Sequence, residues 1–502
     1  MKNKFLILCS LFTFISACST TTVQKENSEA KEIKSVLKTE QTKVISEKKE
    51  TSVPETYKAI VFPKYEYKTP NPADYRVVIS DSITGYIVSD STLPLAAFSV
   101  IFKEESNSEN TAEAAVLELL SGMYRKGGTK NLSADAIDDS LEFISAKISG
   151  SISSKYSDFS VASLSRDFYN TALLAKEIFT NPAFEGKKLE TQKAAFINAS
   201  EHKYDTPSAI LSALRTKVNY KKNNRLLNPN KQEYERVTDA DLKKYGADKF
   251  KSGRIIFAFA GDLPKDSVYA FLKKYFETWP LKNQKENSVA DYSFLNKSGF
   301  YAVEKEITQA NISLNQPFLK RPHKDYYPAV VASFILGGGG FSSRLTTKVR
   351  SENGLAYSIY SNVGNSYKDS TLITIALQTK AESTPFALQL IKEEIERMKN
   401  EEVSEEELEL AKKTLIESLP SMFSTPKDIA FIFAENEFEG KSMNHFQEYI
   451  EEINNVTAKQ VQEMIRKYFD WSKMTISIVG PKKAFESFEN IQVLSLDSLE
   501  FR

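Results

Sequence analysis

Histidine and cysteine are scarce in this sequence of 502 residues, which contains three of the first and two of the second. Both cysteines, Cys9 and Cys18, lie near the N-terminus, so the rest of the chain offers no disulfide and no cysteine nucleophile. The histidines His202, His323 and His445 lie far apart, and His202 is the one with a directly adjacent carboxylate, Glu201, and with Asp205 three positions on. Zinc sites need several ligands, so each histidine is expected to be an ordinary surface or hydrogen-bonded imidazole.

The chain also lacks an excess of charge of either sign, because 66 Lys and Arg balance 66 Asp and Glu. This balance excludes a protein whose whole surface attracts nucleic acid or an anionic membrane, and no nucleic-acid partner is expected. The composition, with 41% hydrophobic and 26% charged residues, is that of ordinary globular proteins. The 32 Phe and 23 Tyr are spread along the chain and are expected to form its core.

The first 18 residues are typical of an export signal. Lys2 and Lys4 precede an apolar run, residues 5–15, that is too short to span a bilayer stably. The sequence Ile-Ser-Ala-Cys that ends at Cys18 resembles the lipobox of bacterial lipoproteins, where the cysteine is lipidated; the alternative is a secretory peptide with a chance cysteine. Because Ser19 is not an Asp-type retention signal, we expect a chain anchored in the outer membrane of the bacterial envelope, facing the periplasm. Residues 19–70 are rich in Lys, Glu, Ser and Thr and are predicted to be a disordered tether.

Two halves of the chain repeat one plan. A Val-Thr helix start at Val237 leads to a strand that ends at Gly261, and a second Val-Thr start at Val456 leads to a strand that ends at Gly480. The same offset of 219 positions relates the segment around Leu189 to the one around Leu408. A shared offset in separated segments predicts an internal duplication.

Each half is predicted to be an α+β domain, a mixed or antiparallel sheet with helices packed on one face, because hairpin-like strand pairs outnumber strict strand–helix alternation. The predicted parts are a signal peptide (1–18), the tether (19–70), an N-terminal domain (71–281), a linker (282–298), a C-terminal domain (299–490) and a tail (491–502).

The segment 336–361, LGGGGFSSRLTTKVRSENGLAYSIYS, is the most distinctive part of the second half. Ser342 or Ser343 is expected to cap a short helix that carries Arg350, and Asn353-Gly354 to end it. A strand should follow, with Leu355, Tyr357 and Ile359 on one face. Arg350 and Tyr357 would then flank one corner, a guanidinium beside a phenol, unless Arg350 pairs with a carboxylate and Tyr357 packs in a core.

This segment resembles the second-domain signature of the pitrilysin family of zinc peptidases, which includes insulin-degrading enzyme and the mitochondrial processing peptidases. The resemblance rests on an Arg and a Tyr seven positions apart, here Arg350 and Tyr357, after a glycine-rich turn. It implies two homologous α+β domains and a substrate-binding role for both residues. It also implies that Arg344 and the glycines contact substrate, although the four glycines, Gly337, Gly338, Gly339 and Gly340, could equally be a plain turn between helices.

Active members of that family carry the zinc motif H-x-x-E-H on the first long helix of the first domain. Aligned on Gly128-Thr129, the motif falls on residues 119–123, Leu-Leu-Ser-Gly-Met, and the later glutamate ligand falls near Asn198 or Ala199. None of these residues supplies a zinc ligand or the general base. We therefore expect no cofactor in this chain and no peptide hydrolysis by it alone.

The resemblance suggests a division of labour between two chains. In two-subunit members, one chain holds H-x-x-E-H with zinc and the other contributes the Arg/Tyr pair. We therefore predict a non-catalytic subunit whose partners are a catalytic H-x-x-E-H chain and a peptide substrate. The alternatives are a binding or scaffold lipoprotein without a role in proteolysis and, more remotely, an independent enzyme with an unrecognised site.

Overall fold

A computed structural model describes residues 56, 60, 67–103, 106–251, 253–281 and 290–502. The predicted signal peptide and Cys18 lie outside these residues, as does most of the predicted tether. In the described part, no helix combines the length and the apolar character that a membrane span requires.

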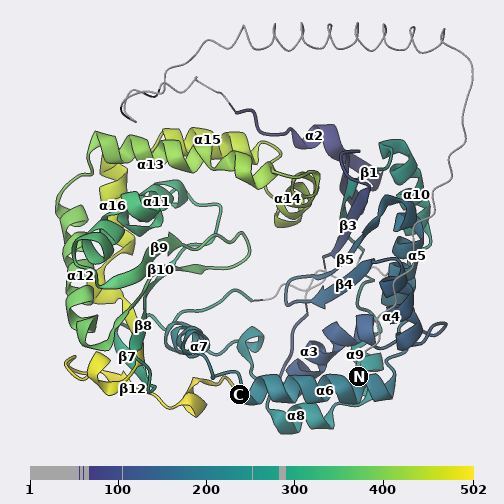
Figure 1. Cartoon of the computed structure of the whole chain (residues 1–502), viewed down its shortest axis with the longest axis horizontal. Helices are drawn as coiled ribbons and strands as arrows, with labels where there is room; N and C mark the ends of the chain where they lie inside the picture. The colour runs from purple at the N-terminus through teal and green to yellow at the C-terminus, as the bar shows by residue number, and fades with distance from the viewer. Residues whose placement is uncertain (1–55, 57–59, 61–66, 104–105, 252, 282–289) are drawn as a thin grey trace, which may run out of the picture. The chain divides into compact units, whose positions relative to one another are not determined.

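The first half folds around a six-stranded mixed sheet in the order β1-β2-β6-β3-β5-β4 (Figure 1). The predicted hairpin of β1 and β2 is present, β2 pairs with β6 in parallel, and the remaining pairs are antiparallel. The strands are β1 (Arg76–Ser80), β2 (Ile83–Ser89), β3 (Leu95–Phe102), β4 (Lys147–Ile152), β5 (Ser157–Leu164) and β6 (Ile255–Gly261). The helices are α2 (Pro72–Tyr75), α3 (Thr111–Lys126), α4 (Ala134–Phe143), α5 (Phe168–Thr180), α6 (Gly186–Glu201), α7 (Pro207–Asn219), α8 (Lys231–Arg236), α9 (Asp239–Gly246) and α10 (Lys265–Glu277).

The second half has a sheet in the order β12-β7-β11-β8-β10-β9, which repeats five strands of the first, with β7 and β11 parallel at the matching position; its edge strand β12 differs, since it pairs with β7 in parallel. Its strands are β7 (Gly299–Glu304), β8 (Gln309–Phe318), β9 (Ala356–Val363), β10 (Thr371–Lys380), β11 (Thr475–Gly480) and β12 (Gln492–Val493). Its helices are α11 (Tyr326–Ser333), α12 (Thr384–Asn400), α13 (Glu405–Glu417), α14 (Pro426–Glu439), α15 (His445–Asn454) and α16 (Ala458–Tyr468). The matching topologies confirm the predicted fold class. Residues 491–502, assigned above to a tail, supply β12 to the sheet.

The central strands show why these residues form sheets. In β5, buried and less buried residues alternate, with Phe159 and Val161 pointing into the core. In β6, IIFAFAG, every residue before the final glycine is buried, and β11 is buried throughout. Such continuous burial belongs to strands covered on both faces.

One helix from each half covers the sheet of the other half. α14 packs on β2 and β6 of the first sheet, and α7 packs on β11 and β8 of the second (Figure 1). The two helices begin alike, since Thr206 accepts from the backbone of Ala209 and Thr425 from that of Asp428, 219 positions apart, and each threonine is followed by a proline. Because of this exchange, residues 67–502 pack as one unit. The offset predicted the duplication but not the exchange.

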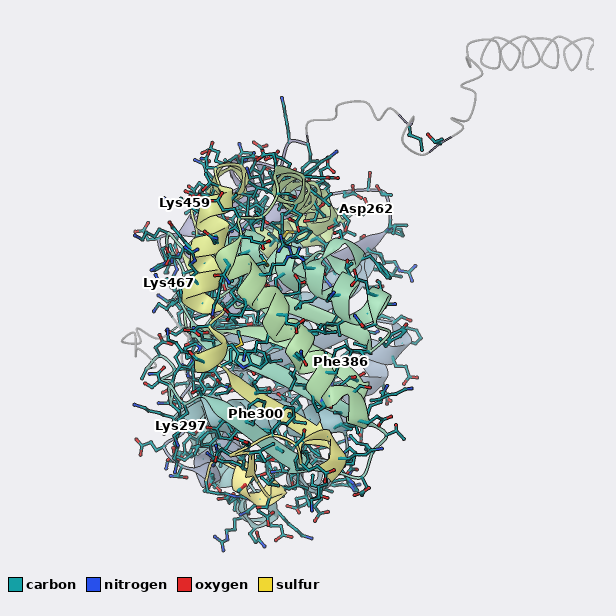
Figure 2. The ribbon with its side chains drawn as sticks, turned by 90° about the vertical axis from the view of Figure 1, so that its left-hand side faces the viewer. Asp262, Lys297, Phe300, Phe386, Lys459 and Lys467 are labelled. Carbon is teal, nitrogen blue, oxygen red and sulfur yellow. The ribbon has the colours of Figure 1, made fainter. Side chains whose placement is uncertain are left out.

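The exchanged helices divide the apolar interior into layers. α14 contributes Phe433 and Phe438 to a cluster with Tyr86 and Val88 of the first sheet, while the opposite face of that sheet carries the aromatic core of the first half. α16 lies at the surface of the second half, with Lys459 near its start and Lys467 near its end (Figure 2). The expectation that most Phe and Tyr are core residues holds for these layers.

Candidate functional site

The glycine run begins within a π-helical turn, Phe334–Gly338, which directly follows α11. A Cβ atom at Gly337 would lie 2.7 Å from the backbone nitrogen of Ser361 in β9, so only glycine permits this close approach. Gly340 has φ +59°, in the left-handed region. Packing and turn geometry within the chain therefore account for Gly337 and Gly340, and the predicted substrate contact of the four glycines stays a prediction.

The two serines after the run do not cap the next helix, contrary to our prediction. Ser342 and Ser343 donate their hydroxyl protons to the carbonyl oxygens of Gly339 and Gly340, at 2.8 and 2.7 Å. Their hydroxyls are thereby used to hold the turn closed. The segment that follows, Thr346–Glu352, is π-helical and has no side-chain cap. It ends at Asn353 and at Gly354, with φ +62°, as predicted.

Arg350 and Tyr357 lie side by side, as the sequence predicted. The Arg350 Cζ is 5.2 Å from the centre of the Tyr357 ring and 4.7 Å from the centre of the Phe341 ring. Both rings are exposed, Tyr357 at 81% and Phe341 at 73%. No carboxylate of the described residues lies within ion-pair distance of Arg350, so the alternative of a carboxylate-paired Arg and a core Tyr does not hold. We call Phe341, Arg350 and Tyr357 the Arg/Tyr corner.

A β-bulge directs Tyr357 to the surface. In the pairing of β9 with β10, Ile359 faces Leu377 and Ala356 faces Thr379, so Tyr357 and Ser358 together oppose a single residue. Ile359 is buried in the core of the second half. The prediction that Tyr357 and Ile359 share one face is therefore wrong, because the bulge interrupts the alternation between them.

Arg344 binds a carboxylate of α13 and not the residues of the Arg/Tyr corner. Its Nε and a terminal nitrogen donate to the two carboxylate oxygens of Glu407 in α13, at 2.7 and 2.8 Å. These hydrogen bonds lower the pKa of Glu407 to about 2, against the opposing effect of burial. The observed contact is thus structural, and the predicted contact between Arg344 and substrate stays a prediction.

Core packing occupies the position of the zinc motif. Leu119 and Met123 of α3 are 0% exposed and belong to the apolar cluster of the first half. A Cβ atom at Gly122 would lie 3.3 Å from the side-chain oxygen of Gln192 in α6. Asn198 and Ala199, the positions expected for the later ligand, are exposed. These residues do not fit a zinc ion, because they provide no imidazole and no carboxylate.

The three histidines lie in unrelated surroundings. His202 contacts Asp205 at 2.8 Å on the surface, and the Nδ1 of His323 accepts a hydrogen bond from the backbone of Asp325. Burial lowers the pKa of His445 to about 4. Within the described residues, no three His, Cys, Asp or Glu side chains gather as metal ligands would.

Two residues that lie at the candidate positions, Phe341 and Gln192, were not predicted from the sequence. Phe341 follows the glycine run, but nothing in the sequence distinguishes an exposed aromatic there from the many core aromatics. Gln192 faces Gly122, whereas counting along the chain pointed to positions 198 and 199. Helical periodicity could have found Gln192, because it lies on the same face of α6 as the buried Leu189.

Comparisons with known proteins agree with this arrangement. Residues 236–415 match the peptidase M16 inactive domain. A Bacillus subtilis protein called uncharacterized zinc protease YmxG is 25% identical over 415 residues, covering 81% of this chain and 98% of that protein. A Helicobacter pylori protein called non-peptidase homolog YmxG is 25% identical over 400 residues, covering 78% and 90%.

Solved structures share the fold. A crystal structure from Pseudomonas fluorescens, described as a peptidase M16 inactive domain, superposes with a TM-score of 0.68 at 24% identity, covering 80% of this chain and 95% of that one. The predicted resemblance to the pitrilysin family is thereby confirmed. The chain is thus similar over most of its length to M16-type proteins, among them a non-peptidase homologue, and its residues 236–415 match the peptidase M16 inactive domain.

Proposed function

We propose that this chain is the non-catalytic subunit of a two-chain zinc peptidase and that its Arg/Tyr corner binds substrate beside the zinc of a separate H-x-x-E-H subunit. One contrast supports the proposal. Arg350 and Tyr357 are held together at the surface without an ion pair among the described residues, while the zinc-motif positions of α3 are filled by buried apolar side chains. Their hydrogen-bonding groups are therefore available to a ligand.

The corner offers suitable chemistry for a peptide. The Arg350 guanidinium and the Tyr357 hydroxyl are hydrogen-bond donors, and a peptide carbonyl oxygen accepts more strongly as negative charge develops on it. The π-helical segment and the bulged strand hold both donors before substrate arrives, so little reorganisation is needed. The proposed contribution of this chain is therefore to bind and polarise the substrate, and the zinc chemistry belongs to the partner.

The test is peptide hydrolysis by the mixture of this chain and its H-x-x-E-H partner. Tyr357→Phe removes one hydroxyl from an exposed ring, and Arg350→Ala removes the guanidinium; each should lower kcat/KM by ~10²–10³, as loss of one oxyanion donor does. The matched controls are Tyr169→Phe and the exposed Arg166→Ala in the first half, which should leave hydrolysis unchanged. Equal activity of wild type, Tyr357→Phe and Arg350→Ala would refute the role of the corner and favour the scaffold alternative.

We also propose that Cys18 carries the lipid that anchors the chain to the outer membrane, facing the periplasm. Support comes from the lipobox-like sequence, since Cys18 lies outside the described residues. Cys18→Ala should move the protein from the membrane fraction to the soluble periplasmic fraction. If the variant stays in the membrane fraction, the anchor lies elsewhere.

A further inference from the structure

A hollow of about 380 Å³ lies between the exchanged helix α7 and the second sheet. Its floor consists of residues of β8, β9 and β10, and its wall is the face of α7 that carries Ser208, Leu211, Ser212 and Arg215. These four positions follow helical spacing, so they line one side of the helix. The volume is at the lower end of the ~300–1,000 Å³ typical of small-ligand sites.

The floor of the hollow combines apolar residues, such as Ile312 and Leu377, with a group of polar side chains. Gln378 donates to Asn311 at 2.6 Å across β10 and β8, and Ser313 donates to the side chain of Asn315 at 2.9 Å. Asn311 and Ser313 are nearly fully buried, yet both line the hollow together with Gln378. The bond between Gln378 and Asn311 uses the Gln378 nitrogen and the Asn311 oxygen, so the Asn311 amide nitrogen and the Gln378 amide oxygen can bind a polar occupant.

Arg215 is the one charged residue among the residues that line the hollow. In the described part of the chain, its guanidinium makes no ion pair and no hydrogen bond. A guanidinium carries five donors in a planar fork that matches a carboxylate. The hollow thus offers the planar guanidinium of Arg215 to a carboxylate, and none of the described residues that line it carries a carboxylate.

The hollow is continuous with the Arg/Tyr corner through β9. Tyr357 belongs to the corner, and the next residue of the bulge, Ser358, lines the hollow together with Tyr360. An extended peptide advances about 3.3 Å per residue. A peptide that runs along β9 from Tyr357 would therefore bring one of its following side chains to the hollow.

We infer that this hollow is a carboxylate subsite, in which Arg215 binds an acidic group of the peptide that the Arg/Tyr corner holds. The inference rests on the proposed function and specifies its substrate class as peptides with a carboxylate near the bound segment. The carboxylate belongs either to an Asp or Glu side chain or to the C-terminus of the peptide. The hydroxyls and amides of the floor bind the neighbouring polar groups.

The test is selection of peptides from a random decapeptide library on the immobilised full chain, once with amidated and once with free C-termini. The wild type should enrich Asp and Glu at one position of the amidated library by about tenfold, the factor expected for a charge-assisted interaction. Enrichment seen only among peptides with free C-termini would assign the subsite to the terminal carboxylate. Arg215→Gln should abolish either preference, Arg215→Lys should retain part of it, and the control Arg166→Gln should leave it intact.

Two results would overturn the inference, and they differ in what they say about the proposed function. Peptides recovered without a carboxylate preference, or with the same preference in Arg215→Gln, would refute the subsite and leave peptide binding standing. Recovery of no peptide at all, by the chain alone and by its complex with the H-x-x-E-H partner, would refute both. Circular dichroism of Arg215→Gln must match the wild type, and Arg215→Lys gives a second variant if it does not.

Discussion

At the scale of single residues, Leu119 illustrates how a catalytic position becomes a structural one. The family resemblance places the first zinc ligand at this position, and the Leu119 side chain is 0% exposed in the core of the first half. Tyr357 shows the opposite, since a large aromatic residue is 81% exposed in a strand. Burial, rather than residue type alone, separates the two roles.

Leu119→Ala should therefore lower the free energy of unfolding by ~2–5 kcal/mol, because it leaves a cavity in a packed core. The control Leu173→Ala, on α5 of the same half, removes a side chain that is half exposed and should change stability by less than ~0.5 kcal/mol. Urea denaturation followed by circular dichroism measures both. A cost below ~1 kcal/mol for Leu119→Ala would mean that the position is not part of the core.

At the scale of elements, α13 fixes the segment that follows the glycine run. Glu407 closes the capping box of α13 with Ser404, and its carboxylate also binds Arg344. The side chain of Arg344 is only 9% exposed, so its charge depends on this partner. One carboxylate therefore joins the start of a helix to the loop that leads to the Arg/Tyr corner.

Substitutions of Glu407 can separate its two contributions. Glu407→Gln keeps a residue suited to the capping box but removes the charge, and should cost ~1 kcal/mol. Glu407→Ala removes the cap as well and leaves Arg344 unpaired, so it should cost ~2–3 kcal/mol. Denaturation at pH 7 with the exposed control Glu406→Ala measures the difference. Equal losses for Gln and Ala would show that the cap contributes nothing.

At the scale of the whole molecule, the exchanged helix α14 is fixed to the first half by one carboxylate. Glu437 accepts two hydrogen bonds from Arg76 at 2.9 Å, one from Thr84 at 2.6 Å and one from Tyr86 at 2.8 Å. Asp369, in the turn between β9 and β10, likewise binds Arg225 of the first half. Burial alone would raise the pKa of Glu437, but the hydrogen bonds outweigh it and the pKa is lowered.

This lowered pKa predicts how stability depends on pH. A carboxylate whose folded pKa lies below its ordinary value of about 4.3 stabilises the fold above that pH, and the contribution is lost as the pH falls through the folded pKa. Glu437→Gln should therefore cost ~2 kcal/mol between pH 6 and 8, and the difference from wild type should shrink below about pH 4. Denaturation at several pH values measures it, with the exposed Glu451→Gln as control. A difference independent of pH would contradict the role of the charge.

The linear order of residues determined the duplication, the two mixed sheets, the family resemblance and the adjacency of Arg350 and Tyr357. Helix caps, glycines and a constant offset are local signals, and they act between residues that are close in sequence or related by repetition. The sequence also showed that residues 119–123 provide no zinc ligand, since this depends on residue type alone.

Tertiary packing determined the contacts between residues that are far apart in the chain. The exchange of α7 and α14, the ion pair of Arg344 with Glu407, and the placement of Arg215 over the floor of the hollow each join residues far apart in the chain. The bulge that exposes Tyr357 is set by the register between β9 and β10, which no single strand encodes. The same residue types would fit several registers and helix positions, and only the burial of both sheet faces selects among them.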